Sequence, residues 1–245
     1  LITLRLLTSQ KRSRSSLTVS NRRPYLRAAE DLRDNPGQWA AYNASGHCVV
    51  LAGPGSGKTK TLTIKMARML AEDVAEPRGI ACITYNNECA KELEQRLDQL
   101  GVEPGGRVFI GTVHSFSLTQ ILLPYAKTAG LGLPDGFTVA TQSEHRDALE
   151  RAVRRTIDGP SNPQEWNFVM GRYRRSCLDR SVSQWSTTNP QLAQLVEAYE
   201  AELRTKGLID FDDMPLVAVR ALRDNEWLQR ALLAKYPTLI VDEYQ

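Results

Sequence analysis

The sequence predicts an α/β fold in which a parallel β-sheet is flanked by helices and carries an inserted, mostly helical subdomain. Three observations predict it. Short apolar runs alternate with helical patterns from about residue 28 to residue 116, as a parallel sheet with crossover helices requires. Residues 117–209 show helical patterns with breaks at 159–163 and 189–190. Another apolar run then follows at 237–241.

The first informative element is a Gly-rich turn between an apolar run and a helix. Residues 48–52 are apolar and rich in valine, which predicts a buried strand, and a helical pattern runs from residue 58 to about 71. Glycines in the turn let several backbone N–H groups point at one anion, and the helix start adds partial positive charge. We therefore predict a P-loop that binds ATP, with these contacting residues: Ala52, Gly53, Pro54, Gly55, Ser56, Gly57, Lys58 and Thr59.

Two side chains of this turn have separate expected roles. Lys58 would reach the outer phosphates, and the Thr59 hydroxyl would ligate Mg²⁺. The usual pattern begins with glycine, whereas Ala52 stands at that position. The alternative is that the Gly-rich turn only connects the strand tightly to the helix and binds no ligand.

The second element is the apolar run 237–241, which predicts a strand followed by two carboxylates. Ligands of open α/β sheets collect at the carboxyl ends of the strands. Asp242 would hold Mg²⁺ through water, and Glu243 would act as the general base that polarises the attacking water. A plain acidic turn is the alternative.

Charge is unevenly distributed along the chain. The net charge is +3, but residues 1–27 hold seven of the 31 basic residues and no acidic one, so the remainder carries 24 basic and 28 acidic residues. Overall charge therefore gives no argument for DNA binding. The basic, Ser-rich start predicts a disordered tail over 1–27, with an organellar presequence or a longer natural N-terminus as alternatives, since no initiator Met is present.

The remaining composition indicates a globular chain without a membrane span. The apolar content is 42%, and no apolar run approaches the roughly 18–20 residues that cross a bilayer. The cysteines show no CxxC pairing and are expected to be reduced packing residues of a cytoplasmic protein: Cys48, Cys82, Cys89 and Cys177. The three histidines are not at metal-ligand spacing, so we expect no zinc site.

Four further segments accompany the P-loop and the DEYQ ending. They are NPGQ at 35–38, ITYNN at 83–87, IGTVHSF at 110–116 and LIDFDDM at 208–214. In this order the chain resembles the UvrD/Rep/PcrA-like superfamily 1 DNA helicases over roughly residues 33–245, with the middle third only loosely matched. The leading Ala of the P-loop is common in that family. Any one of these segments alone is a weak signal, whereas GTVHSF, DFDD and DEYQ together are specific.

The resemblance implies an N-terminal motor part with a RecA-like core at 28–116 and 210–245 and the insertion at 117–209. It implies ATP and Mg²⁺ as cofactors, with single-stranded DNA and duplex junctions as partners, and 3′-to-5′ movement coupled to ATP hydrolysis. Gln38 would read adenine and Gln245 would sense the γ-phosphate region. The single-strand path would be lined by Thr84, Tyr85, Thr112, His114 and Phe116.

Two features depart from the family pattern. Asn87 and Glu88 stand where the family has a lysine, so the resemblance implies no lysine contact to a phosphate at this point. The family's second RecA-like domain has no counterpart in these 245 residues, so we expect the isolated chain not to unwind DNA. A nucleotide-dependent DNA-binding module without unwinding activity is the alternative function. A P-loop kinase is a weaker one, because it gives GTVHSF and DFDD no role.

Charged side chains in and after the insertion allow two interpretations each. Arginines with an interleaved tyrosine are able to grip a nucleic-acid backbone, or else form solvated, paired faces: Arg151, Arg154, Arg155, Arg172, Tyr173, Arg174 and Arg175. Asp210, Asp212 and Asp213 suggest a cation site, but capping of a helix that begins near Met214 is the better interpretation. Packing is expected for Trp166, Trp185 and Trp227.

Overall fold

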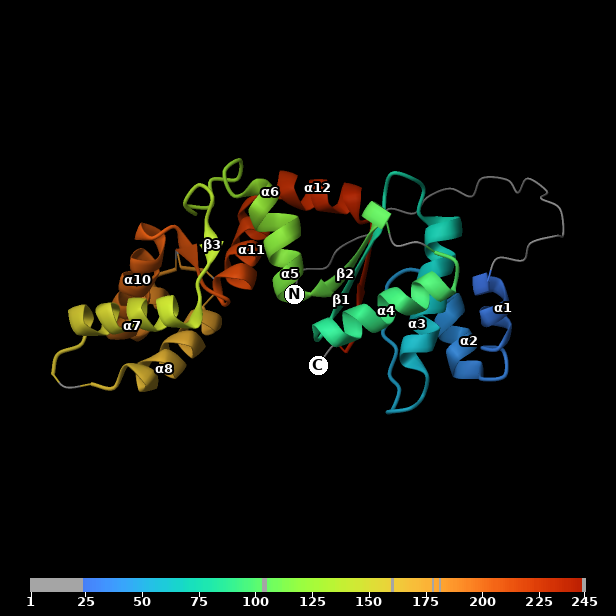
Figure 1. Ribbon diagram of the computed structural model, residues 1–245, viewed down its shortest axis with the longest axis horizontal. Helices are drawn as coiled ribbons and strands as arrows, with labels where there is room; N and C mark the ends of the chain where they lie inside the picture. Colours follow the sequence, from blue (N-terminus) through green and yellow to red (C-terminus); the bar gives the residue numbers. More distant parts are fainter. Residues whose placement is uncertain (1–23, 103–104, 160, 178, 181, 244–245) are drawn as a thin grey trace. The chain divides into compact units, whose positions relative to one another are not determined.

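The computed structural model describes residues 24–102, 105–159, 161–177, 179–180 and 182–243 (Figure 1). Contacts divide the chain into two compact units. The first contains the described residues up to Thr112 together with those from Ala231, and the second contains Val113–Arg230. Among the described residues, no helix is long and apolar enough to cross a membrane.

The first unit is built on a parallel sheet with strand order β2-β1-β5. Its strands are β1 (Ile80–Thr84), β2 (Val108–Thr112) and β5 (Thr238–Val241). Ile80 lies opposite Val108 on one side and Thr238 on the other. The helices of this unit are α1 (Pro24–Glu30), α2 (Pro36–Asn43), α3 (Lys58–Arg68) and α4 (Asn87–Gln99), with the short turns η1 (Met69–Asp73) and η2 (Gly105–Arg107).

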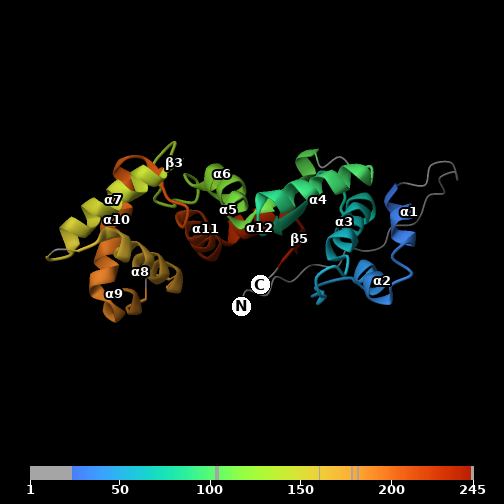
Figure 2. The ribbon, with the colours of Figure 1, turned by 60° about the horizontal axis from the view of Figure 1, so that its bottom comes forward.

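Helices α3 and α4 supply the apolar core that covers the sheet. Leu93 and Leu97, one turn apart on α4, are fully buried in a cluster with Met66 of α3 and with Ile80 and Cys82 of β1. Asn86 begins α4 by accepting a hydrogen bond from the Cys89 N–H at 2.8 Å. Figure 2 shows α3 and α4 together beside the strands. The predicted α/β architecture, a parallel sheet flanked by helices, is confirmed.

The strand predicted at residues 48–52 is absent, and that prediction is wrong. The segment has no regular structure, and Val49 and Leu51 are 84% and 91% exposed. A strand is stable only when a neighbour takes its backbone hydrogen bonds. Within the described chain, β5 lies at the edge of the sheet and no strand pairs with 48–52. The β5 strand is itself only half-buried, although its position at 238–241 matches the prediction.

The second unit is mostly helical, as the pattern over 117–209 predicted. Its elements are α5 (Val113–Phe116), η3 (Ser117–Leu122), α6 (Leu123–Tyr125), β3 (Thr138–Val139), α7 (Gln142–Thr156), α8 (Pro163–Ser176), α9 (Gln184–Thr188), α10 (Pro190–Thr205), β4 (Leu208–Ile209) and α11 (Asp213–Asp224). Helix α12 (Glu226–Lys235) crosses the boundary between the units. The breaks at 159–163 and 189–190 are helix starts, where Asn162 and Asn189 cap α8 and α10.

The boundaries between the two compact units differ from the expected domain boundaries. Residues 113–116 and 210–230 group with the helical unit, because α11 packs against α5 and η3. The division into a core and an insertion therefore stays a prediction. Residues 24–27 were assigned to the basic tail but begin α1, where Tyr25 is buried and donates to Glu72 at 2.9 Å. The rest of that predicted tail lies outside the described residues.

A buried ion cluster joins α8, α10 and α11 in the second unit. Arg174 is 1% exposed and its guanidinium contacts Asp210 at 2.5 Å and Asp213 at 2.8 Å. The Tyr199 hydroxyl donates to Asp210 at 2.8 Å, and Arg204 lies 2.9 Å from Asp213. Burial alone would lower the pKa of Arg174, but Asp210 and Asp213 raise it, so the pKa lies above the ordinary arginine value. Arg174 is therefore a packing residue and is not available to nucleic acid.

The other predicted arginines are mostly paired at the surface. Glu202 binds both Arg151 and Arg155, and Arg175 lies 2.6 Å from Asp212. Tyr173 stacks on the buried Trp185 with ring centroids 4.8 Å apart. The paired interpretation is thus favoured over a grip on a nucleic-acid backbone.

The predicted capping role of the aspartates is supported in part, since the side chain of the N-cap residue Asp212 makes no capping hydrogen bond. Asp210 accepts the N–H of Asp213, the first residue of α11, at 2.7 Å. In the part of the chain that the structure describes, no group of acidic, histidine or cysteine side chains is arranged to hold a metal ion by itself.

Candidate nucleotide-binding site

The Gly-rich loop leads directly into the N-terminus of α3. Gly55 and Gly57 have φ of 74° and 79°, a left-handed conformation that glycine adopts without a side-chain clash. Gly57 is the N-cap of α3 and provides no side-chain hydrogen bond to it. The first turn of α3 is therefore left open to an anionic ligand, since helix N-termini bind anions through free N–H groups and partial positive charge.

Lys58 lies across the loop that precedes it. Its ammonium donates to the carbonyl oxygens of Ala52 at 2.9 Å and Gly53 at 3.3 Å. The next residue, Thr59, is half-buried in the first turn of α3. Lys58 and Thr59 are thus the first two residues of the helix that follows the loop, and their roles toward phosphate and Mg²⁺ stay predictions.

Gln38 of α2 contacts the same loop. Its Nε2 donates to the Ser56 carbonyl oxygen at 2.7 Å, and a Cβ added to Gly57 would lie 2.6 Å from that nitrogen. A side-chain amide has two N–H donors and one carbonyl acceptor. One N–H binds the loop, and within the described residues the second N–H and Oε1 have no hydrogen-bond partner.

The two carboxylates follow β5 at the end of the sheet. The Asp242 N–H donates to the Ile83 carbonyl of β1 at 2.8 Å. Burial and the neighbouring Glu243 raise the pKa of Asp242, while the charge of Lys58 acts in the opposite direction. Glu243 has a φ of 57°, which is unfavourable for any residue with a Cβ. Gln245 lies outside the described residues.

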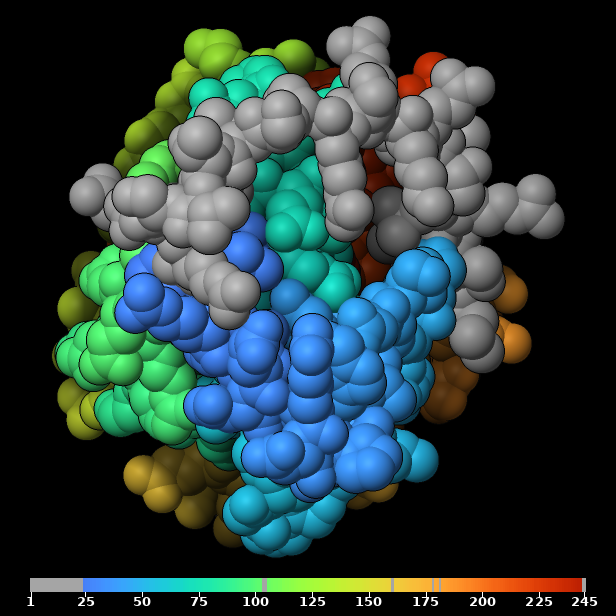
Figure 3. Space-filling model, turned by 90° about the vertical axis from the view of Figure 1, so that its right-hand side faces the viewer, coloured from blue at the N-terminus to red at the C-terminus, as the bar shows by residue number. Residues whose placement is uncertain are grey.

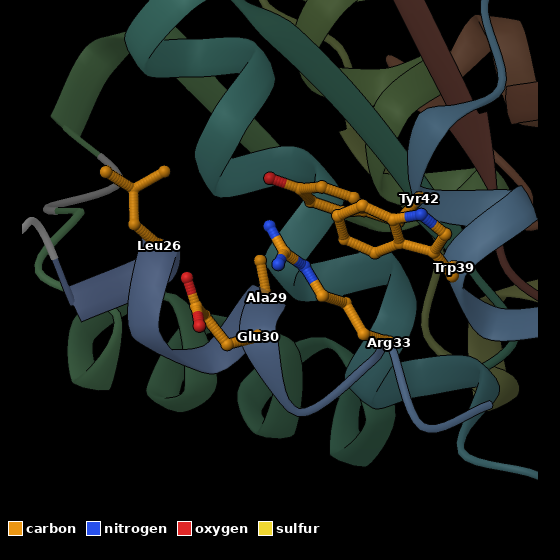
Figure 4. A pocket seen from close by; sticks show the side chains of 6 residues that line it. All are labelled: Leu26, Ala29, Glu30, Arg33, Trp39 and Tyr42. Atoms are coloured by element: carbon orange, nitrogen blue, oxygen red, sulfur yellow. The ribbon is translucent and has the colours of Figure 1, made fainter. Parts of the chain in front are cut away.

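A pocket beside α2 is separate from these residues. Helices α1 and α2, which lie on the surface seen in Figure 3, enclose about 180 Å³ between them. Its lining is shown in Figure 4: Leu26, Ala29, Glu30, Arg33, Trp39 and Tyr42. Ligand pockets typically enclose roughly 300–1,000 Å³, so this pocket is a packing feature of α1 and α2.

The residues predicted to contact DNA differ in their exposure. Tyr85 follows β1 in the first unit and is 81% exposed, while Thr112 is half-buried at the end of β2. Thr84 is 3% exposed, so contact of its side chain with DNA is not supported. It ends a strand whose residues 80–82 are also fully buried. In the second unit, His114 and Phe116 are half-buried in α5.

Phe211 is a candidate that the sequence analysis missed. Its ring is 60% exposed and stacks on His114, with centroids 3.7 Å apart and an angle of 19°. Burial lowers the pKa of His114, opposed by Asp212, which favours a neutral ring in the stack. The available signal was a phenylalanine placed among three aspartates in a turn, where an apolar side chain has no packing role.

Comparisons with known proteins place the chain in a family of helicase domains. A family model described as UvrD/REP helicase N-terminal domain matches residues 34–245. ATP-dependent DNA helicase Rep of Escherichia coli (strain K12) is 30% identical over 220 residues, which are 87% of this chain and 32% of that protein. DNA helicase II of Rickettsia typhi is 30% identical over 213 residues, 84% of this chain and 32% of that protein. A probable DNA helicase II homolog of Rickettsia felis is 31% identical over 214 residues, with 85% and 32% covered. The chain thus spans about a third of the length of these curated relatives.

Proposed function

Because the chain belongs to the UvrD/REP helicase N-terminal domain family, we propose that it is the ATP-binding part of a DNA helicase or translocase that moves 3′ to 5′ on single-stranded DNA. Its first unit is then a P-loop, RecA-like core. The observation that carries the proposal is the junction of the Gly-rich loop with α3, where Lys58 and Gln38 both contact the loop.

Each residue of the junction has a proposed task. The first turn of α3 receives the phosphates, and Lys58 exchanges the carbonyls of Ala52 and Gly53 for the outer phosphate oxygens. The Thr59 hydroxyl would supply a hard oxygen ligand that suits Mg²⁺, and Asp242 would hold the ion through water; when bound, the ion neutralises phosphate charge. Glu243 orients water and takes its proton.

The DNA contacts are proposed from exposed rings in each unit. Tyr85 of the first unit and the His114–Phe211 stack of the second are each suited to stacking on a base. Phe116 and Thr112 are proposed as further contacts with single-stranded DNA and duplex junctions. Unwinding is proposed to need a second RecA-like domain moving against the first. A strand-displacement assay of these 245 residues, with and without such a domain, tests this assignment.

Replacing Gln38 by alanine is expected to reduce the preference for ATP over GTP. The free N–H and Oε1 of the amide match a donor and an acceptor on adenine, and losing them costs about 1 kcal/mol per hydrogen bond. Competition of ATP and GTP against a fluorescent ATP analogue measures the preference. If the two nucleotides compete equally with wild type, or if the variant keeps the full preference, Gln38 does not read the base.

Alanine at Tyr85, Phe116 or Phe211 is expected to weaken single-stranded DNA binding by about 1–3 kcal/mol for each stacked base. Fluorescence anisotropy with a labelled oligonucleotide at several salt concentrations measures this. Thr84→Val is the matched control, because that side chain is buried. Residues 1–23 are removed in a parallel set, since a basic tail binds DNA nonspecifically. Wild-type affinity in all three alanine variants would exclude these stacking contacts.

A further inference from the structure

Helix α2, which carries Gln38, is held at both ends by side chains. At its start, Asn35 Oδ1 accepts the N–H groups of Gly37 at 3.1 Å and Gln38 at 3.2 Å. At its end, Lys65 of α3 donates to the carbonyls of Ala41 at 2.8 Å and Ala44 at 2.6 Å. A helix of eight residues is not stable alone in water, so its position depends on such contacts.

The Lys65 ammonium donates its hydrogen bonds to carbonyl groups at the end of α2. Among the residues that the structure describes, no acidic side chain lies within ion-pair distance of its ammonium. Carbonyl groups at a helix C-terminus carry partial negative charge and attract a cation. Burial lowers the pKa of Lys65, which fits an ammonium enclosed by the two helices.

The same helix α3 begins at the phosphate loop. One element therefore connects the N–H groups of the loop to the C-terminal end of α2, and Arg68 adds a second contact by lying 4.3 Å from the centre of the Tyr42 ring. The Gln38 side chain adds a direct contact between α2 and the phosphate loop through its hydrogen bond to the Ser56 carbonyl. If the end of α2 were released, the amide would lose its fixed distance from the loop.

We propose that Lys65 is a positioning residue for base recognition: it fixes α2 on α3 so that Gln38 meets the nucleotide base while the loop meets the phosphates. This inference rests on the proposed function, since it assumes that Gln38 contacts the base. It predicts that Lys65 affects the choice between nucleotides and leaves the triphosphate contacts intact.

The test compares Lys65→Met with wild type by competition against a fluorescent ATP analogue in Mg²⁺. The competitors are ATP, GTP and inorganic tripolyphosphate, which has no base. Lys65→Met is expected to lower the ATP-over-GTP preference about three- to tenfold, the range for one lost hydrogen bond, and to change tripolyphosphate affinity less than about twofold. Lys65→Arg should restore the preference, because guanidinium donors reach both carbonyls. Lys91→Met removes an exposed charge on α4 and should behave as wild type.

Two results would overturn the proposal. One is an unchanged ATP-over-GTP preference in Lys65→Met. The other is an equal loss for ATP, GTP and tripolyphosphate, which would mean a purely structural role. If circular dichroism shows that Lys65→Met does not fold, Lys65→Gln replaces it, since glutamine keeps an uncharged hydrogen-bond donor. The ATP-over-GTP preference of Lys65→Gln then decides in the same way. Failure of the proposed function looks different, because wild type would then bind no ATP analogue, and the inference would fall with it.

Discussion

Replacing Arg174 by methionine is expected to lower the free energy of unfolding by about 3–5 kcal/mol, the cost of removing one partner from a buried ion pair. Methionine fills a similar volume but leaves Asp210 and Asp213 buried beside Tyr199 without their central cation. Urea denaturation followed by tryptophan fluorescence measures the loss.

The adjacent residue provides a matched control for this variant. Arg175 also pairs with an aspartate, Asp212 at 2.6 Å, but its side chain is 54% exposed. Surface ion pairs contribute about 0–1 kcal/mol, so Arg175→Met should change stability little. Equal stability of the two variants would contradict the role assigned to the buried cluster.

The cluster also has a defined pH dependence. Burial raises the pKa of Asp210. Arg174 and the hydrogen bonds to Asp210 lower this pKa by more than burial raises it, so it lies below the ordinary value. A lowered pKa in the folded state stabilises the protein above the unfolded pKa, and this contribution is lost as the pH falls through the folded pKa. The free energy of unfolding of Arg174→Met should therefore fall less than that of wild type when the pH is lowered.

Replacing Lys58 by alanine is expected to weaken binding of a fluorescent ATP analogue with Mg²⁺ by roughly 100-fold. The ammonium is proposed to make charged hydrogen bonds to the outer phosphates, and each such bond is worth about 1.5–3 kcal/mol. Direct titration of the analogue gives the ratio of dissociation constants.

Lys127→Ala is the control for Lys58→Ala, since it removes one positive charge from an exposed position in the second unit. It should bind the analogue as wild type does. Equal affinity of wild type and Lys58→Ala would contradict the phosphate site. Weak absolute affinity would not, because only one side of the nucleotide pocket is proposed to lie in these residues.

Features that depend only on residues close in the sequence were predicted correctly. The Gly-rich turn before Lys58 predicted a loop that enters a helix, and the breaks predicted at 159–163 and 189–190 coincide with the starts of α8 and α10. These signals need only the chain within one or two turns. The run at 238–241 was predicted in the same way and pairs with β1.

Signals that depend on distant partners failed. Residues 48–52 have the composition of a buried strand, but composition does not supply the neighbouring strand. Arg174 could not be told from its exposed neighbours, because its burial depends on aspartates about 36 residues away. Thr84 and Tyr85 are adjacent, but Thr84 ends the buried strand β1 and Tyr85 follows it, so the first is buried and the second exposed.

Glu243 illustrates a trade-off between stability and activity. A residue with a side chain at a φ of 57° costs about 1–2 kcal/mol relative to a relaxed conformation, whereas glycine tolerates it. A glycine at this position would make the chain more stable and remove the carboxylate proposed to activate water. Selection for stability alone would therefore favour a different residue at position 243, where a stabilising substitution would also remove the proposed general base.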